Sequence, residues 1–224
     1  MIRLYHWNLD PAGRLVRLCL AEKGLGFETV ESAPWSPHPD LKLLGPGAVA
    51  PALLQDGTGG RIVAVGTRAI CEFLEESVEG QHLLPLHPGQ RAEARRLWAW
   101  VEEGFEEVTD KLLTERVMQW VRRDRQPDSE KLRRGAHTLR GRLTFLNALV
   151  ETHGFIAGRD LTLADLAAAA HLSACDYFGD VEWAAVPDLR TWYARLKSRP
   201  SFRPLLADRL AAVRPSPHYA DLDF

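Results

Sequence analysis

Residues 161–172, LTLADLAAAAHL, predict a helix that is buried on every side. Thr162 can cap the N-terminus of this helix, and Asp165 can return a hydrogen bond to the backbone N–H of the capping residue. The stretch from Leu163 to Leu172 is rich in alanine and offers no continuous polar face to solvent. We therefore expect this helix to lie at the centre of a helical domain.

Helical signals surround this stretch throughout the second half of the chain, where strand signals cease. Pro127-Asp128-Ser129 is typical of a helix start, because proline and capping side chains gather there. The sequence thus predicts an all-α C-terminal domain over residues 91–213, followed by a tail over residues 214–224. Its expected outer helices cover residues 91–123, 127–150, 187–197 and 202–213.

The first part of the chain alternates short β-prone runs with helical ones. Residues 10–13 have the composition of a loop, and Thr67 is expected to cap a helix. Glycines and prolines over residues 80–90 predict a linker, so an α/β N-terminal domain covers residues 1–79. Its expected strands cover residues 2–5, 27–30, 51–55 and 61–65, and its first helix covers residues 14–23.

The composition of the chain argues against several classes of function. The net charge of −2 gives no overall attraction to nucleic acid. No apolar run is long enough to cross a membrane, and the first residues carry no secretion signal, so we expect a cytoplasmic protein. The three cysteines lie far apart and in no metal-binding spacing, so the sequence predicts no metal site.

Several short motifs, taken in order, resemble the glutathione transferase superfamily over nearly the whole chain. The resemblance implies a thioredoxin-like N-terminal domain before the all-α domain. The motifs that carry it are Val16-Arg17-Leu18, Val49-Ala50-Pro51-Ala52-Leu53, Thr67-Arg68-Ala69-Ile70, Leu161-Thr162-Leu163-Ala164-Asp165-Leu166 and Pro187-Asp188-Leu189.

That family holds glutathione with three parts, of which one is present here. A hydroxyl or thiol in the first loop stabilises the glutathione thiolate. A proline, expected to be cis, presents backbone to the cysteine of the tripeptide, and an acidic residue followed by serine binds the γ-glutamyl end. The resemblance therefore implies a vestigial site with no catalytic residue and no cofactor, formed by Tyr5, His6, Asp10, Ala50, Pro51, Gly66 and Thr67.

The chemistry of the residues that depart from the family pattern shows why they do not suit glutathione. Asp10 lies where serine- or cysteine-type members place the activating group, and a carboxylate accepts hydrogen bonds and repels a thiolate. Gly66-Thr67 replaces the acidic residue and serine, so no carboxylate awaits the ammonium of the ligand. The cis-proline position, Ala50-Pro51, is the part that remains.

A narrower resemblance is to a group of glutathione-transferase-like bacterial cell-division proteins. Ala33-Pro34-Trp35 and the ending Tyr219-Ala220-Asp221-Leu222-Asp223-Phe224 carry it, together with the altered first loop. It implies a homodimer that binds, bundles and curves filaments of the tubulin-like GTPase FtsZ, recruited to the division site. The filament contacts that it implies are Trp35, Glu115, Arg116 and Leu132. The tail residues implied to contact other division proteins are Asp221, Leu222, Asp223 and Phe224.

Two other functions remain open from the residues. His6 or Tyr5, with Ala50-Pro51, could support a glutathione-dependent transferase or isomerase. The basic stretch near Arg122 could instead serve a transcription-associated adaptor of the same fold, in contact with polymerase or nucleic acid.

Overall fold

The computed structural model describes residues 1–57, 60–117, 123, 125–211 and 213–222 of the chain. Contacts divide it into two compact units, Met1–Leu83 and Leu84–Phe224. Among the described helices, none has the length and apolarity needed to cross a membrane.

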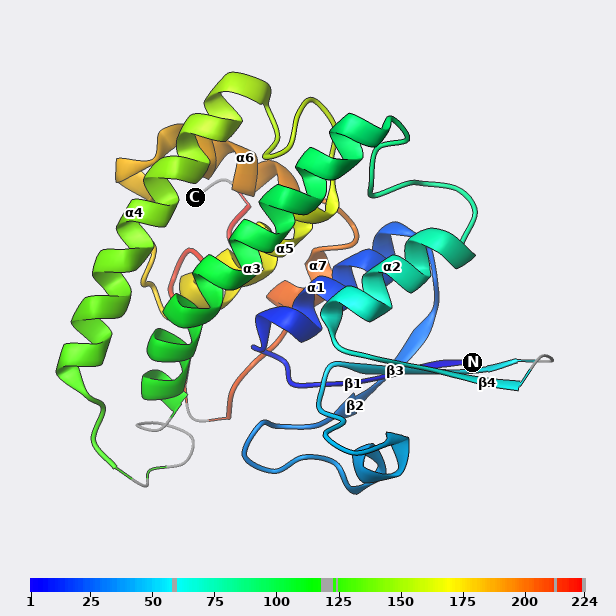
Figure 1. Cartoon of the computed structure of the whole chain (residues 1–224). Helices are drawn as coiled ribbons and strands as arrows, with labels where there is room; N and C mark the ends of the chain where they lie inside the picture. The colour runs from blue at the N-terminus through cyan, green and yellow to red at the C-terminus, as the bar shows by residue number, and fades with distance from the viewer. Residues whose placement is uncertain (58–59, 118–122, 124, 212, 223–224) are drawn as a thin grey trace. The chain divides into compact units, whose positions relative to one another are not determined.

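The first unit is a four-stranded mixed sheet in the order β2-β1-β3-β4. Strand β1 pairs parallel with β2 and antiparallel with β3, and β3 pairs antiparallel with β4. Helices α1 and α2 cover one face of the sheet (Figure 1), and a 3-10 helix covers the other through the Tyr5–Leu41 apolar cluster. The elements are β1 (Ile2–His6), α1 (Pro11–Glu22), β2 (Phe27–Glu31), the 3-10 helix (Pro39–Leu44), β3 (Ala52–Gly57), β4 (Gly60–Val65) and α2 (Thr67–Ser77).

The starts of α1 and α2 correct two sequence predictions. Helix α1 begins at Pro11, inside the expected loop, because the Asp10 carboxylate caps it by accepting from the backbone N–H groups of Ala12 and Gly13. Thr67 does not cap α2. The capping position belongs to Gly66, whose φ of 87° is a conformation that glycine adopts without strain.

In the described part of the second unit every regular element is a helix, and its centre is α5 (Leu163–Tyr177). All 15 residues of α5 are buried, as the alanine-rich sequence predicts. Helix α3 packs against both α5 and α4, and α4 packs against α6 (Figure 1). The other elements are α3 (Pro88–Val117), α4 (Ser129–His153), a 3-10 turn (Trp183–Ala185), α6 (Pro187–Lys197) and α7 (Arg203–Leu206).

The capping box predicted at the start of α5 is confirmed. The backbone N–H of Thr162 donates to Asp165 Oδ2 at 2.9 Å, and the Thr162 hydroxyl donates to the same oxygen at 3.0 Å. Asp165 Oδ1 accepts from the backbone N–H of Ile156 at 2.8 Å and from Trp192 Nε1 at 3.1 Å. One buried carboxylate thus joins the start of α5 to the preceding turn and to α6.

The helix expected over residues 202–213 is wrong beyond its first turn, because α7 ends at Leu206. The Tyr177 hydroxyl accepts from the backbone N–H of Leu210 at 2.9 Å and donates to the carbonyl of Val213 at 2.7 Å. A side chain of α5 therefore forms hydrogen bonds with backbone groups that would have paired with each other in a continued helix.

Candidate functional site

The residues around the end of β1 are already engaged in structural contacts. The Tyr5 hydroxyl donates to Asp40 Oδ2 at 3.1 Å, and its ring lies in the apolar cluster beneath the 3-10 helix. Burial, together with this hydrogen bond, raises the pKa of Tyr5. The side chain is 1% exposed, so its hydroxyl is directed at Asp40 and away from solvent.

His6 is enclosed beneath the first turn of α1. It is 1% exposed, and a Cβ added at Gly13 would lie 2.8 Å from the His6 Cβ. The absence of a side chain at Gly13 therefore lets α1 approach β1 closely. His6 and Gly13 together fix the position of the loop that contains Asp10.

Asp10 places a carboxylate at the N-terminus of α1. The backbone N–H groups of Ala12 and Gly13, which could stabilise an incoming anion, donate to this side chain. An anionic sulfur approaching the same helix end would meet a carboxylate that has taken these donors.

The Ala50-Pro51 peptide bond is cis, as the resemblance to the glutathione transferase superfamily implies. The carbonyl of Pro51 accepts from the backbone N–H of Gly66 at 2.9 Å, which joins the start of β3 to the start of α2. The structure thus brings Ala50, Pro51, Gly66 and Thr67 to one edge of the first unit. At this edge Gly66 occupies the N-cap position of α2, and Thr67 is the first residue of the helix.

Trp35 lies in an ordered loop of the first unit. Its ring meets that of Trp7 edge-on, with the ring centroids 5.0 Å apart, and Trp7 is buried. The backbone N–H of Ser32 donates to the His6 carbonyl at 2.8 Å, and the Ser32 hydroxyl accepts from the backbone N–H of His38 at 3.1 Å. These contacts place Trp35, which remains partly exposed, against the buried Trp7.

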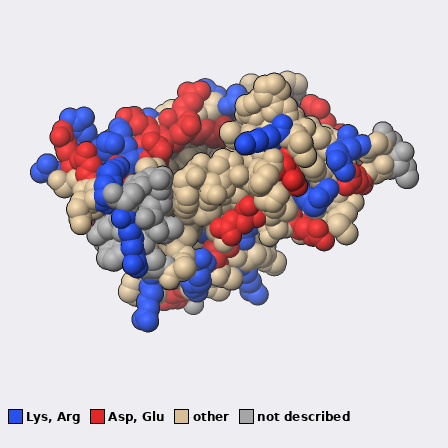
Figure 2. Space-filling view, turned by 90° about the horizontal axis from the view of Figure 1, so that it is seen from below, with Lys and Arg blue, Asp and Glu red and all other residues tan. Residues whose placement is uncertain are grey.

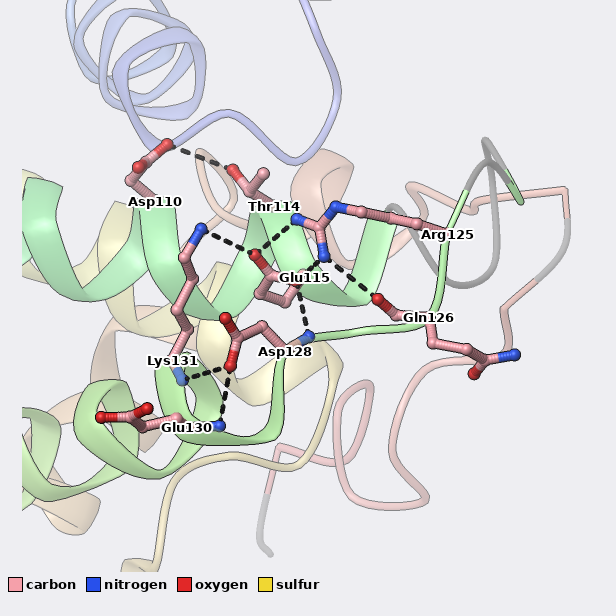
Figure 3. A network of polar contacts seen from close by, with 8 residues as sticks. All are labelled: Asp110, Thr114, Glu115, Arg125, Gln126, Asp128, Glu130 and Lys131. Atoms are coloured by element: carbon pink, nitrogen blue, oxygen red, sulfur yellow. Dashed lines mark hydrogen bonds and ion pairs between the residues drawn. The ribbon is translucent and has the colours of Figure 1, made fainter.

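Glu115 is the centre of a polar network between α3 and α4 (Figure 3). Its carboxylate accepts two hydrogen bonds from Arg125, at 2.6 and 2.7 Å, and one from the backbone N–H of Asp128 at 2.9 Å. Lys131 Nζ lies 3.5 Å away. The hydrogen bonds from Arg125 hold the pKa of Glu115 at about 2, well below its usual value.

Glu115 is itself 1% exposed, so the sequence-based expectation that it contacts a partner directly does not fit its burial. Its carboxylate faces the chain segment that leads into α4, where Asp128 caps the helix. The accessible positive charges of this network belong to Arg125 and Lys131, whose side chains are 43% and 54% exposed.

Arg116 and Leu132 lie on the two helices that this network joins. Arg116 donates to Asp180 Oδ1 at 2.7 Å, and its side chain is 32% exposed. Leu132, in the first turn of α4, is partly exposed. Together with Arg125 and Lys131 they define what we term the α3–α4 face. Arg122 lies outside the described residues.

The tail is engaged with the second unit over most of its length. Tyr219 is fully buried, and His218 Nε2 lies 2.8 Å from Asp176 Oδ1. Asp221 is exposed and Leu222 is partly exposed. Asp223 and Phe224 lie outside the described residues.

Sequence reasoning missed three contacts that shape these sites, those of Trp7 with Trp35 and of Arg125 and Asp128 with Glu115. Trp7 holds Trp35, although a tryptophan next to a short strand carries no signal of that pairing. Arg125 and Asp128 partner Glu115 across 10 and 13 positions of sequence, a separation at which no helical spacing rule applies.

Comparisons with known proteins show which family the chain resembles. A model described as "Glutathione S-transferase, N-terminal domain" matches residues 11–77, and one described as "Glutathione S-transferase, C-terminal domain" matches residues 113–209. FtsZ-localized protein A of Caulobacter vibrioides is 45% identical, over 99% of this chain and 97% of its own length.

Two solved structures are similar along their whole length. FzlA from C. crescentus matches with a TM-score of 0.94 at 44% identity, covering 100% of this chain and 99% of that one. A glutathione S-transferase from Rhodospirillum rubrum matches with a TM-score of 0.92 at 42% identity, covering 100% of both chains. These matches confirm the predicted fold, a thioredoxin-like α/β domain followed by an all-α domain.

Proposed function

We propose that this chain, which belongs to the glutathione S-transferase family, is a non-enzymatic cell-division protein that binds FtsZ filaments. The observation that carries the proposal is its 45% identity to FtsZ-localized protein A over nearly the full length of both chains. The chain binds, bundles and curves the filaments as a homodimer at the division site, and its tail contacts other division proteins.

The first unit offers a suitable anchor for a filament. Trp35 is partly exposed, and its ring packs against that of Trp7 without a partner present. Large aromatic side chains of this kind contribute much of the binding energy at protein interfaces, and prior ordering reduces the entropy lost on binding.

The second unit contributes the α3–α4 face. Glu115 acts from beneath this face, because it holds Arg125 and the start of α4 in place. Arg116, Lys131 and Leu132 then supply charge and apolar area at the surface. A homodimer carries two copies of each binding face and can therefore link neighbouring filaments.

The glutathione site argues against thiol-transfer chemistry. Asp10 occupies the helix end at which a thiolate would be stabilised, and the Tyr5 hydroxyl is committed to Asp40. Gly66-Thr67 supplies no carboxylate for the ligand's ammonium. Losing one charge-assisted bond, worth about 1.5–3 kcal/mol, weakens binding roughly tenfold to a hundredfold.

Nucleic-acid binding is less well supported than filament binding. Figure 2 shows acidic and basic side chains close together on the face that it displays. The basic residues of α3 and α4 are also paired in part, Lys111 with Glu107 and Arg134 with Glu130. A mixed surface of this kind suits a protein partner better than a polyanion.

Co-sedimentation with FtsZ polymers assembled in GTP tests the proposal. Wild-type chain is expected to pellet with the filaments, and Trp35→Ala is expected to pellet less while keeping its thermal stability. Leu43→Ala is the matched control, because Leu43 is an apolar side chain of the same unit that is 83% exposed. Equal pelleting of wild type and Trp35→Ala would remove Trp35 from the filament contact.

The second candidate is a glutathione-dependent transferase or isomerase. The cis Ala50-Pro51 bond and the similarity to the Rhodospirillum rubrum glutathione S-transferase favour it. Specific retention on immobilised glutathione, together with thiol-conjugation activity that disappears in His6→Ala, would establish this function in place of the adaptor.

A further inference from the structure

We infer that residues 213–219 form a strap that the rest of the second unit binds in cis, with Tyr219 as its anchor. A partner then meets a tail whose backbone is already fixed up to Tyr219, with Ala220 and Asp221 exposed after the anchor. The consequence for partner recognition rests on the proposed function, whereas the docking of the strap does not.

Tyr219 is seated in the interior of the second unit. It is 0% exposed, and its hydroxyl donates to the Leu205 carbonyl at 2.9 Å. Its ring meets that of Tyr177 edge-on, with the centroids 5.1 Å apart. Burying a tyrosine removes a large apolar area from water and gives its hydroxyl a partner, as expected for a docked segment and not for a free peptide.

Polar contacts fix the segment just before Tyr219. The backbone N–H of Ser216 donates to the Tyr177 carbonyl at 2.8 Å, and the Ser216 hydroxyl donates to the Asp176 carbonyl at 2.6 Å. His218 Nε2 lies 2.8 Å from Asp176 Oδ1, an atom that also accepts from Trp183 Nε1 at 2.7 Å. The strap therefore follows the C-terminal end of α5.

Lys197 adds an independent reason for docking. Its side chain is fully buried, and its ammonium donates to the His218 carbonyl at 3.0 Å. A buried ammonium needs acceptors, and the strap supplies one of them. Removing the strap would take this acceptor from Lys197 and a partner from the buried Asp176.

The anchor determines what the tail offers to a partner. Asp221 is exposed and Leu222 partly exposed directly after the strap. These two side chains suit a partner that places a basic side chain next to an apolar pocket. Because Tyr219 fixes the preceding backbone, binding orders fewer residues than a free eleven-residue tail would require.

Hydrogen–deuterium exchange of the full-length chain tests the strap. In wild type, the amides of Ser216 and Tyr219, whose N–H groups are hydrogen-bonded, are expected to exchange slowly. Tyr219→Ala is expected to speed exchange of the amides at positions 216 and 219 at least about tenfold and to leave α3 and α4 unchanged. Tyr219→Phe keeps the buried ring and is expected to retain most of the protection.

Hydrogen–deuterium exchange of the wild-type chain tests the docking of the strap even if Tyr219→Ala fails to fold. Unprotected amides at Ser216 and Tyr219 in wild type would overturn the inference, as would unchanged exchange in a folded Tyr219→Ala variant. Pelleting with FtsZ filaments is measured on the same samples, and folded Tyr219→Ala is expected to pellet like wild type. Failure of wild type to pellet refutes the proposed function and leaves the exchange result, and with it the strap, unaffected.

Discussion

At the scale of single residues, the side chain of Asp165 joins three segments of the second unit by hydrogen bonds. It is fully buried and accepts four hydrogen bonds, three of them from N–H groups in three different segments. Each of these donors depends on the carboxylate, because burial denies it water as a substitute.

We therefore expect Asp165→Ala to lower the free energy of unfolding by about 3 kcal/mol or more. Asp160→Ala is the control, because Asp160 is exposed, and its effect is expected to stay within about 0.5 kcal/mol. Urea denaturation measures both variants. A loss below about 1 kcal/mol for Asp165→Ala would mean that the donors find other acceptors.

Two glycines give a matched test of the contact between α1 and His6. A Cβ at Gly13 would lie 2.8 Å from the His6 Cβ, whereas a Cβ at Gly141, on an exposed part of α4, meets nothing within 4 Å. Gly13→Ala is expected to destabilise by about 1–3 kcal/mol through overpacking. Gly141→Ala is expected to stabilise by up to about 1 kcal/mol, since alanine favours helix. Thermal melts of the two variants that shift in the same direction would contradict this account.

At the scale of elements, the connection between α3 and α4 depends on a charge that titrates in acid. The pKa of Glu115 is about 2 in the folded chain and its ordinary value is 4.5, with hydrogen bonds from Arg125 as the main cause. A depressed acidic pKa means that the carboxylate contributes stability above its unfolded pKa. That contribution is lost as the pH falls through the window from 4.5 to about 2.

Glu115→Gln is accordingly expected to cost about 1–3 kcal/mol at pH 7, the lower end reflecting the solvent around Arg125. The difference from wild type should shrink steadily as the pH falls below 4.5. Urea titrations of both proteins at several pH values measure it. A difference that stays constant between pH 7 and pH 3 would show that the charge of Glu115 does not stabilise this connection.

The elements also show how far the sequence could predict the structure. The cap at Thr162 and Asp165 was predictable because its partners lie three residues apart, and the alanine-rich stretch indicated full burial of α5. The start of α2 was missed because Gly66 acts through its backbone conformation, which side-chain patterns do not encode. The burial of Glu115 and Tyr219 was missed for another reason, because it depends on partners distant in sequence.

At the scale of the whole molecule, the candidate sites are spread over both units. Trp35 belongs to Met1–Leu83, whereas the α3–α4 face and the strap belong to Leu84–Phe224. The glutathione-site residues were identified from the sequence by resemblance. Their present contacts, such as Tyr5 with Asp40, depend on folding and became visible in the structure. We propose that the exposed surfaces, and not the vestigial glutathione site, carry the function.

Co-sedimentation of the full chain with FtsZ filaments in GTP, with and without excess glutathione, tests this claim most directly. The account predicts that the chain pellets with the filaments and that the pelleted fraction is the same in both conditions. A chain that stays in the supernatant, or whose pelleting changes when glutathione is added, would contradict it.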